Sequence, residues 1–187
     1  MNETWPEIKK RKMKERRGDI FDWVQSLVVA LLVCVLLFTF VGRIVNVSGT
    51  SMLDTLRNND RIVISDLFYT PKRGDIVVLR KTSFSDEPIV KRVIALGGQT
   101  VNIDFEKGVV YVDGEALDEP YINAPTHEPE DFTEPVTVPE GCVFVMGDNR
   151  NRSTDSRSAR VGCLDERLIL GKVFLRLTPL NKFGGMK

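Results

Sequence analysis

Three short polar segments carry the residues of this sequence that could do chemistry. The first is VSGTSM at 47–52, which centres on Ser51; the second is the pair Lys91-Arg92 inside PIVKRVIAL; the third is GDNRNRSTDSR at 147–157. A serine hydroxyl is a weak nucleophile on its own and needs a neighbouring base. Taken singly, each segment also fits a structural role: a turn, a strand lysine that faces water, or a solvated loop.

Lys91 is the best candidate for such a base. In strict strand alternation Ile89 and Val93 share its face, and apolar neighbours of this kind exclude water from the amine. Loss of water disfavours the ammonium form and lowers the pKa, and a neutral amine near the working pH is a competent general base. The one histidine, His127, lies in the Pro/Glu-rich stretch PTHEPE. A serine nucleophile is therefore better served here by lysine than by histidine.

A long apolar segment near the N-terminus predicts a membrane anchor. Residues 26–41 carry no charge, and with residues 20–23 the run covers about 22 residues, enough for a helix to cross roughly 30 Å of hydrocarbon. Residues 1–19 hold seven basic and four acidic side chains, and this excess predicts a cytoplasmic N-terminus. A cleaved signal peptide fits less well, because its apolar run is usually shorter and FTFVGRIVNV holds no small-x-small site. We predict a cytoplasmic basic head (1–19), a transmembrane anchor (20–42) and an extracytoplasmic catalytic domain (43–187).

The remainder of the chain is patterned as β structure. Short β-branched runs are separated by Gly, Pro, Asn and Asp, which is typical of an all-β sheet or barrel. These runs are RIVISD, DIVVLRK, PIVKRVIAL, TVNIDF, VVYVDG, CVFVMGD and LILGKVFLRL. Asp113-Gly114 is a strong hairpin signal. Residues 115–140, rich in Pro, Glu and Asp, predict a surface excursion from the core.

Composition argues against several function classes. Lys+Arg and Asp+Glu are equal at 26 each, so the net charge gives no indication of nucleic-acid binding. No phosphate-binding glycine loop and no zinc or calcium motif occurs, and we expect neither a cofactor nor a metal. Cys142 and Cys163 could pair in an oxidising compartment; a disulfide and two buried thiols both stay open.

Four segments together resemble the boxes of bacterial type I signal peptidases, which are membrane-bound Ser/Lys proteases. SGTSMLDTL (48–56) resembles the serine box, RGDIVVLR (73–80) the Arg-Gly-Asp box, VKRVIALGG (90–98) the Lys-Arg box, and GDNRNRSTDSR (147–157) the Gly-Asp-Asn-Arg box. They follow the family's order behind a suitable anchor and cover nearly the whole chain. The short excursion and single anchor resemble the Gram-positive-type members of the family.

The resemblance implies roles for the matching residues. It assigns the nucleophile Ser51, the base Lys91, the lysine-orienting Ser153 and the supporting ion pair of Asp155 and Arg157. The backbone N–H of Ser51 would form part of the oxyanion hole. Gly49 stands where some family members carry a hydroxyl donor, so the second oxyanion donor stays unassigned. No cofactor is implied.

The departures from the family pattern leave the proposed Ser/Lys pair intact. Asp54 and Gly97 stand where the family usually has proline, and Gln99 stands where it has an acidic residue. Asn151 and Arg152 replace Asp-Asn. These differences bear on the rigidity of turns rather than on the chemistry.

The implied fold is mostly β: a signal peptidase/repressor-protease-like β core with a small appended β region, preceded by one N-terminal transmembrane helix. The implied function is removal of N-terminal signal peptides from exported preproteins at the cell membrane. The implied partners are the signal peptides of secretory preproteins, the lipid bilayer and the secretion translocon; nucleic acid is not among them. Val47, Met52, Ile89 and Val90 would line shallow apolar pockets that admit small residues such as alanine.

Two alternatives stay open. A self-cleaving, repressor-like Ser/Lys protein would share the broad fold, but the anchor stands here in place of its DNA-binding half. The other alternative is a non-catalytic, membrane-tethered β domain that binds exported chains or partners. That reading would be favoured if Ser51 or Lys91 were missing, and both are present.

Overall fold

The computed structural model describes residues 5–40 and 42–186, with the side chains of 7–18 and 36–40 outside the description. The chain divides into two compact units, residues 1–41 and residues 42–187.

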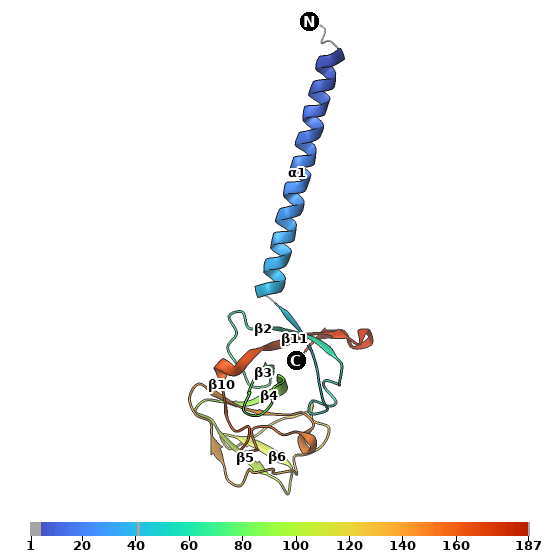
Figure 1. The fold of residues 1–187 in the computed structure, drawn as a ribbon. Coiled ribbons are helices and arrows are strands. Elements are labelled where there is room, and N and C mark those ends of the chain that lie inside the picture. The colour runs from blue at the N-terminus through green and yellow to red at the C-terminus, as the bar shows by residue number, and fades with distance from the viewer. Residues whose placement is uncertain (1–4, 41, 187) are drawn as a thin grey trace. The chain divides into compact units, whose positions relative to one another are not determined.

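Within the first unit the described residues form a helix, α1, at Trp5–Phe40 (Figure 1). It continues without a break from the predicted head into the predicted anchor. No helix in the described part of the chain is long and apolar enough to cross a membrane. All seven basic side chains of the predicted head, and the last apolar ones of the predicted anchor, lie outside the described side chains.

In residues 42–186 the strands form two antiparallel sheets. The larger has the strand order β1-β2-β11-β3-β4-β9-β10, with β12 also paired to β11. Its strands are β1 (Arg43–Asn46), β2 (Arg61–Ser65), β3 (Ile76–Leu79), β4 (Ile89–Leu96), β9 (Cys142–Met146), β10 (Leu164–Asp165), β11 (Ile169–Thr178) and β12 (Gly184–Gly185). The late strand β11 lies between the early strands β2 and β3 (Figure 1).

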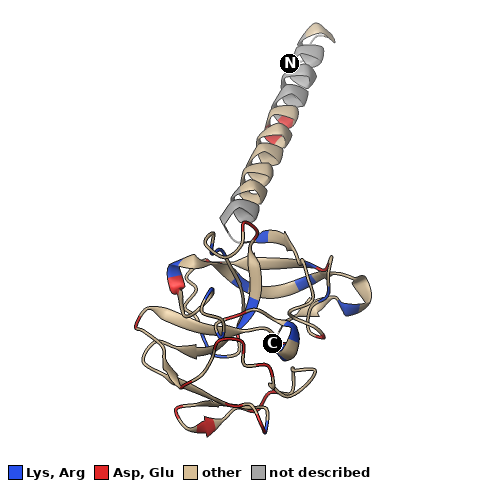
Figure 2. Cartoon of the chain, turned by 60° about the horizontal axis from the view of Figure 1, so that its bottom comes forward, with Lys and Arg blue, Asp and Glu red and all other residues tan. Residues whose placement is uncertain are grey.

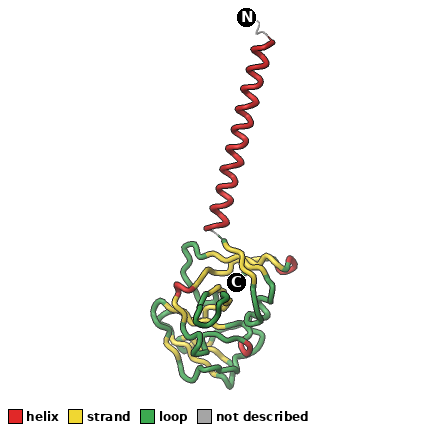
Figure 3. The backbone as a smooth tube through the Cα atoms, in the orientation of Figure 1, coloured by secondary structure: helices red, strands yellow, loops and turns green. Residues whose placement is uncertain are grey.

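The smaller sheet has the order β7-β6-β5-β8. Its strands are β5 (Thr100–Asp104), β6 (Val109–Val112), β7 (Glu115–Ala116) and β8 (Val136–Thr137). The predicted hairpin at Asp113-Gly114 is confirmed, because these residues join β6 to β7 with φ of 54° and 83°, as a two-residue turn of the primed type requires. Loops make up much of the rest of the unit (Figure 3), with short 3-10 helices η1 (Arg150–Arg152), η2 (Glu166–Leu168) and η3 (Leu180–Lys182).

Strands at the centre of the larger sheet are buried on both faces. In β3, Ile76 and Val78 pack into one apolar cluster, while Val77 and Leu79 pack into another. A third cluster joins β4 and β9 of the larger sheet to β5 and β6 of the smaller one. Burial on both faces explains why DIVVLRK and PIVKRVIAL are apolar almost throughout. A charged side chain in β4 is therefore surrounded by protein.

The prediction of a mostly β fold is confirmed, and each predicted run contains a strand. Strands β1, β8, β10 and β12 were not predicted; the last three have only two residues each, too few to show alternation. The excursion at 115–140 is more firmly packed than its composition indicates, because Thr126, Phe132 and Val138 within it are buried.

Cys142 and Cys163 are free thiols in this structure. Both are half-buried and pack against the apolar cluster between the two sheets. Burial raises the pKa of the Cys163 thiol, with a further contribution from Cys142. The thiolate, which is the reactive form of cysteine, is thereby disfavoured.

We predict that neither stability nor activity depends on a Cys142–Cys163 disulfide, because the thiols already fill their sites as small apolar side chains. Mild reductant should leave the melting temperature and the turnover unchanged, and both residues should be alkylated after unfolding without reductant. A Cys142→Ala variant, which cannot form the bond, gives the matched control. Blocked cysteines together with a lower melting temperature in reductant would contradict the prediction.

Candidate active site

The candidate nucleophile lies on a closed loop between β1 and β2. The backbone N–H of Val47 donates to the Asp60 carbonyl at 2.8 Å, and the N–H of Asn59 donates to the Val47 carbonyl at 2.9 Å, so the loop returns to its starting point. Met52 anchors it in the core with 2% of its surface exposed. Ser51 itself is only half-buried. The loop therefore holds Ser51 at the edge of the core, where solvent reaches it.

Lys91 lies in β4 and is 3% exposed. The neighbours on its face, Ile89 and Val93, belong to the same apolar cluster, as strand alternation predicted. The amine nitrogen Nζ donates a hydrogen bond to Ser153 Oγ at 3.1 Å. Burial lowers the pKa of the Lys91 ammonium to about 8, and the carboxylate of Asp155 opposes this shift.

The segment at 147–157 supports the lysine through a chain of hydrogen bonds. Ser153 Oγ donates to Asp155 Oδ2 at 2.9 Å, and the backbone N–H of Gly147 donates to the same oxygen at 2.9 Å. Arg157 closes a two-pronged ion pair on Asp155, with Nε 2.8 Å from Oδ1 and Nη2 2.9 Å from Oδ2. Both side chains of this pair are fully buried. Breaking such a pair from one side costs about 3–5 kcal/mol, so the loop is held firmly in one place.

Gly147 marks the point where the serine loop meets this segment. A Cβ at Gly147 would come within 2.2 Å of Ser153 Oγ and 2.5 Å of the Ser51 carbonyl oxygen. The backbone N–H of Asn149 donates to that same Ser51 oxygen at 2.9 Å. Ser51 and Ser153 are therefore neighbours across Gly147, and only glycine leaves room for both.

The structure thus brings Ser51, Ser153 and Lys91 into one site. Among the described residues the bond recorded for Lys91 Nζ goes to Ser153, and none joins it to Ser51 Oγ. Catalytic hydrogen bonds are often long in an enzyme without substrate and tighten in the complex. The arrangement fits a serine nucleophile with a lysine base that a second serine positions.

A second connection, which the sequence reasoning missed, runs from β4 to the serine loop. Arg92 donates two hydrogen bonds to Asp148, from Nε at 2.8 Å and from Nη2 at 2.7 Å. Thr55 Oγ1 donates to the same carboxylate at 2.5 Å. Arg92 and Asp148 are almost fully buried. The sequence did offer a signal for this ion pair: Arg92 lies beside Lys91 in an apolar strand, and a buried charge requires a partner.

Three of the four predicted pocket residues lie together. Val47, Met52 and Val90 belong to one apolar cluster and are 2–7% exposed, while the half-buried Ile89 packs against another. A hollow of about 320 Å³ adjoins this region. Its lining residues are Val45, Asn46, Val47, Ser48, Asn58, Asn59, Glu87 and Pro88. It therefore adjoins the residues just before Ser51 and just before β4.

His127 has a different environment. It is exposed, its ring nitrogen Nδ1 lies 2.8 Å from the Phe105 carbonyl oxygen, and its backbone N–H donates to Asn151 Oδ1 at 2.9 Å. No group of three or more His, Cys, Asp or Glu side chains that could hold a metal ion occurs in the described part of the chain.

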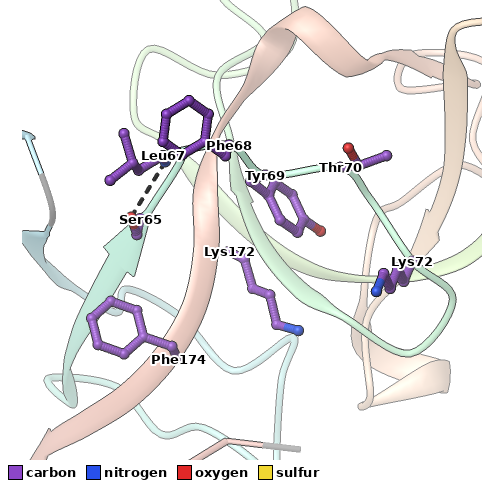
Figure 4. Close-up of a pocket in the computed structure, with 8 residues that line it drawn as sticks. All are labelled: Ser65, Leu67, Phe68, Tyr69, Thr70, Lys72, Lys172 and Phe174. Carbon is purple, nitrogen blue, oxygen red and sulfur yellow. Dashed lines mark hydrogen bonds between the residues drawn. The ribbon is translucent and has the colours of Figure 1, made fainter.

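A separate hollow of about 480 Å³ lies beside β11 and the loop between β2 and β3 (Figure 4). Phe68, at the tip of that loop, is 98% exposed. The lining residues, which Figure 4 labels, include none of the candidate catalytic residues. Its volume alone does not make it the reaction site, since it holds no serine with a buried base.

Comparison with known proteins identifies the family. The family model for signal peptidase, peptidase S26, matches residues 20–178. A probable signal peptidase I-1 of a Synechocystis species is 39% identical over 172 residues, which cover 86% of this chain and 84% of that protein. A signal peptidase I of Bacillus licheniformis is 35% identical over 182 residues, which cover 91% of this chain and 95% of that protein. A crystal structure of a signal peptidase I from Enterococcus faecalis V583 aligns at 31% identity with a TM-score of 0.45, covering 56% of this chain and 97% of that one.

The family match includes every segment that forms the site, and the two sequence relatives align with most of this chain. The chain therefore belongs to the type I signal peptidases of the peptidase S26 family, the enzymes that remove signal peptides.

Proposed function

We propose that this signal peptidase cleaves exported preproteins with Ser51 as the nucleophile and Lys91 as the general base. The observation that carries the proposal is the buried lysine amine, which is bonded to Ser153 at 3.1 Å, next to the glycine that touches both Ser153 and Ser51. A serine nucleophile needs a base within reach, and the burial and position of this amine support Lys91 as that base. The reaction itself needs neither metal nor cofactor.

In the proposed reaction, neutral Lys91 accepts the proton of Ser51 Oγ while that oxygen attacks the scissile carbonyl. The resulting ammonium then donates its proton to the leaving amine, and an acyl-enzyme on Ser51 remains. Water, activated by the same lysine, hydrolyses this ester and frees Ser51. The backbone N–H of Ser51 stabilises the oxyanion as one donor of the oxyanion hole.

Ser153, Asp155 and Arg157 position the amine in this scheme. Ser153 Oγ donates to Asp155, which fixes the direction of its O–H bond, and it accepts from Lys91 with one of its lone pairs. Arg157 holds the carboxylate on its far side. Because the amine is already oriented, the reaction step does not have to include the entropy loss of orienting it.

An extended substrate segment can pair with the free part of β4. Ile89 and Val90 pair with β3 on one side, whereas β9 pairs with β4 only from Arg92 onward. No strand pairs with the other side of Ile89–Lys91 among the described residues, which supports strand addition there. Val47, Met52, Ile89 and Val90 would then shape shallow apolar pockets for small side chains such as alanine.

The same proposal includes the membrane. The apolar run at 20–42 would anchor the chain, with the basic head at 1–19 in the cytoplasm and the catalytic domain, 43–187, outside. Only nine residues separate Val41 from Ser51 in the sequence. Even when extended they reach about 30–35 Å, so the site would stay near the surface where a signal peptide leaves the bilayer. Such confinement raises the effective concentration of substrate, and it favours association with the secretion translocon.

The first test of this proposal concerns orientation. Protease added outside intact cells should digest the domain after residue 43 and leave the head protected, because the excess of basic residues keeps the head in the cytoplasm. An immunoblot against an N-terminal tag measures this, with permeabilised cells as the control in which both parts are digested. A domain that stays protected in intact cells would rule out the orientation.

The second test separates the lysine from the histidine. Lys91→Ala should abolish nearly all turnover of a preprotein, because nucleophile and base act as a unit. Lys91→Arg should not restore it, since a guanidinium stays protonated. His127→Ala should retain activity within about twofold, because the side chain is exposed and its ring bonds to the Phe105 carbonyl oxygen rather than to Ser51 or Lys91. An inactive histidine variant beside an active lysine variant would refute the Ser/Lys mechanism.

The third test uses pH. Because only the neutral amine can accept a proton, kcat/KM should rise about tenfold per pH unit on the acid side and level off above the Lys91 pKa of about 8. At pH 7 about one lysine in ten would be neutral, against fewer than one in a thousand for an ordinary lysine. A profile that is flat from pH 6 to 9, or one that still rises tenfold per unit at pH 10, would be inconsistent with a desolvated lysine base.

A further inference from the structure

The excursion at 115–140 is an acidic strap bound to the loop that supports Lys91. It carries eight acidic residues and neither Lys nor Arg. Figure 2 colours the acidic residues of the described chain red and the basic ones blue. Glu119 forms a buried ion pair with Arg150 at 2.5 Å. The carbonyl of Glu128 accepts a hydrogen bond from Arg157 Nη1 at 2.6 Å. The strap is thus attached to the catalytic loop at successive points.

Glu130 brings the strap close to the lysine. Its Oε2 accepts a hydrogen bond from the backbone N–H of Asp155 at 3.3 Å. Asp155 in turn accepts from Ser153, which accepts from Lys91. The Glu130 carboxylate is therefore linked to the amine through Asp155 and Ser153, although Glu130 is distant in sequence from all three residues.

Glu130 differs from the other acidic residues near the amine in its partners. Asp155 is paired with Arg157, and Asp148 is paired with Arg92, so an adjacent guanidinium offsets each of these charges. No ion pair is recorded for Glu130 among the described residues; its carboxylate faces the backbone of the catalytic loop. Unlike Asp155 and Asp148, Glu130 therefore has no guanidinium hydrogen-bonded to its carboxylate in the described part of the chain.

We propose that Glu130 is a positioning residue of the strap, whose carboxylate acts on the Lys91 amine through the Asp155 loop and sets the pH at which the enzyme becomes active. The inference rests on the Ser51–Lys91 mechanism proposed above. It gives a role to a segment that the reaction scheme itself does not use.

The sign of the effect follows from the groups around the amine. Burial lowers the pKa of Lys91; Asp155, Glu130 and Asp148 raise it, while Arg157 lowers it. Glu130 therefore favours the charged, inactive amine. The pKa of Glu130 is itself raised by burial and by Asp155, so acid removes its charge sooner than that of an ordinary glutamate. Neutralising this residue should let Lys91 lose its proton at lower pH.

The experiment compares pH profiles of kcat/KM on one preprotein for the full-length wild type and three variants. Glu130→Gln keeps the shape and an acceptor oxygen but removes the charge, and it should move the rising limb to lower pH by on the order of half a unit. Below the midpoint its kcat/KM should then be about threefold higher than that of the wild type. Glu130→Asp, which restores the charge, should return the limb toward the wild-type position. Glu134→Gln, an exposed neutralisation in the same strap, is the matched control and should shift nothing.

Three outcomes would overturn the inference. A Glu130→Gln limb that stays in place or moves to higher pH rules out the charge effect. A uniform loss of kcat/KM at every pH, with a lower melting temperature, shows a bracing role only. An equal shift in Glu134→Gln shows that the net charge of the strap acts, rather than Glu130. Failure of the underlying mechanism is recognised separately, because Lys91→Ala would then still cleave.

Discussion

The loss of water around the Lys91 amine is the constraint on which the rest of the site depends. Burying a charged ammonium group in a strand that is covered on both faces costs free energy. The pKa of such a lysine therefore falls, and the neutral amine is favoured. Acidic residues nearby could have kept it charged, but Arg157 and Arg92 neutralise two of them. The arginines thus act on the lysine indirectly. They hold the carboxylates in place as hydrogen-bond acceptors, and their positive charges reduce the effect of those carboxylates on the pKa of Lys91. Each buried pair carries a desolvation penalty, and in return it fixes the geometry around the amine.

The two sides of the site come from distant parts of the chain, and small residues and backbone contacts join them. Gly147 lets the Ser51 loop and Ser153 approach more closely than any other residue would allow. The hydrogen bond from Thr55 to Asp148 is a second contact between the two sides, and the ion pair of Asp148 with Arg92 connects it to β4. The serine loop is therefore held at several points by residues 147–149, the first residues of the segment that binds the lysine. A disturbance of either contact would move the proposed nucleophile and base apart without altering either side chain.

Much of this arrangement was predictable, and the reasons are local. Strands such as PIVKRVIAL were evident from their runs of β-branched residues, and Ser51 and Lys91 from residue type and from the resemblance to signal peptidases. The burial of Val47, Met52 and Val90 could not be predicted, because the sequence does not distinguish an apolar residue that faces a substrate from one that faces the core. The roles of the strap were also hidden: a Pro/Glu-rich stretch is typical of a solvated loop, and contacts such as that between Glu119 and Arg150 depend on tertiary structure alone. Short strands such as β8 form only because a partner lies beside them.

The central claim is that the Lys91 amine loses its proton at a much lower pH than an ordinary lysine, and a direct titration of that amine tests it. Side-chain NMR of ¹³C- and ¹⁵N-labelled lysine in a Ser51→Ala background, with Lys91→Arg to assign the signal, follows protonation without any turnover. The structure predicts that Lys91 titrates near pH 8, well below the ordinary value for a lysine. A Lys91 signal that titrates near that ordinary value would contradict the account, since the amine would then stay a cation and could not accept the proton of Ser51.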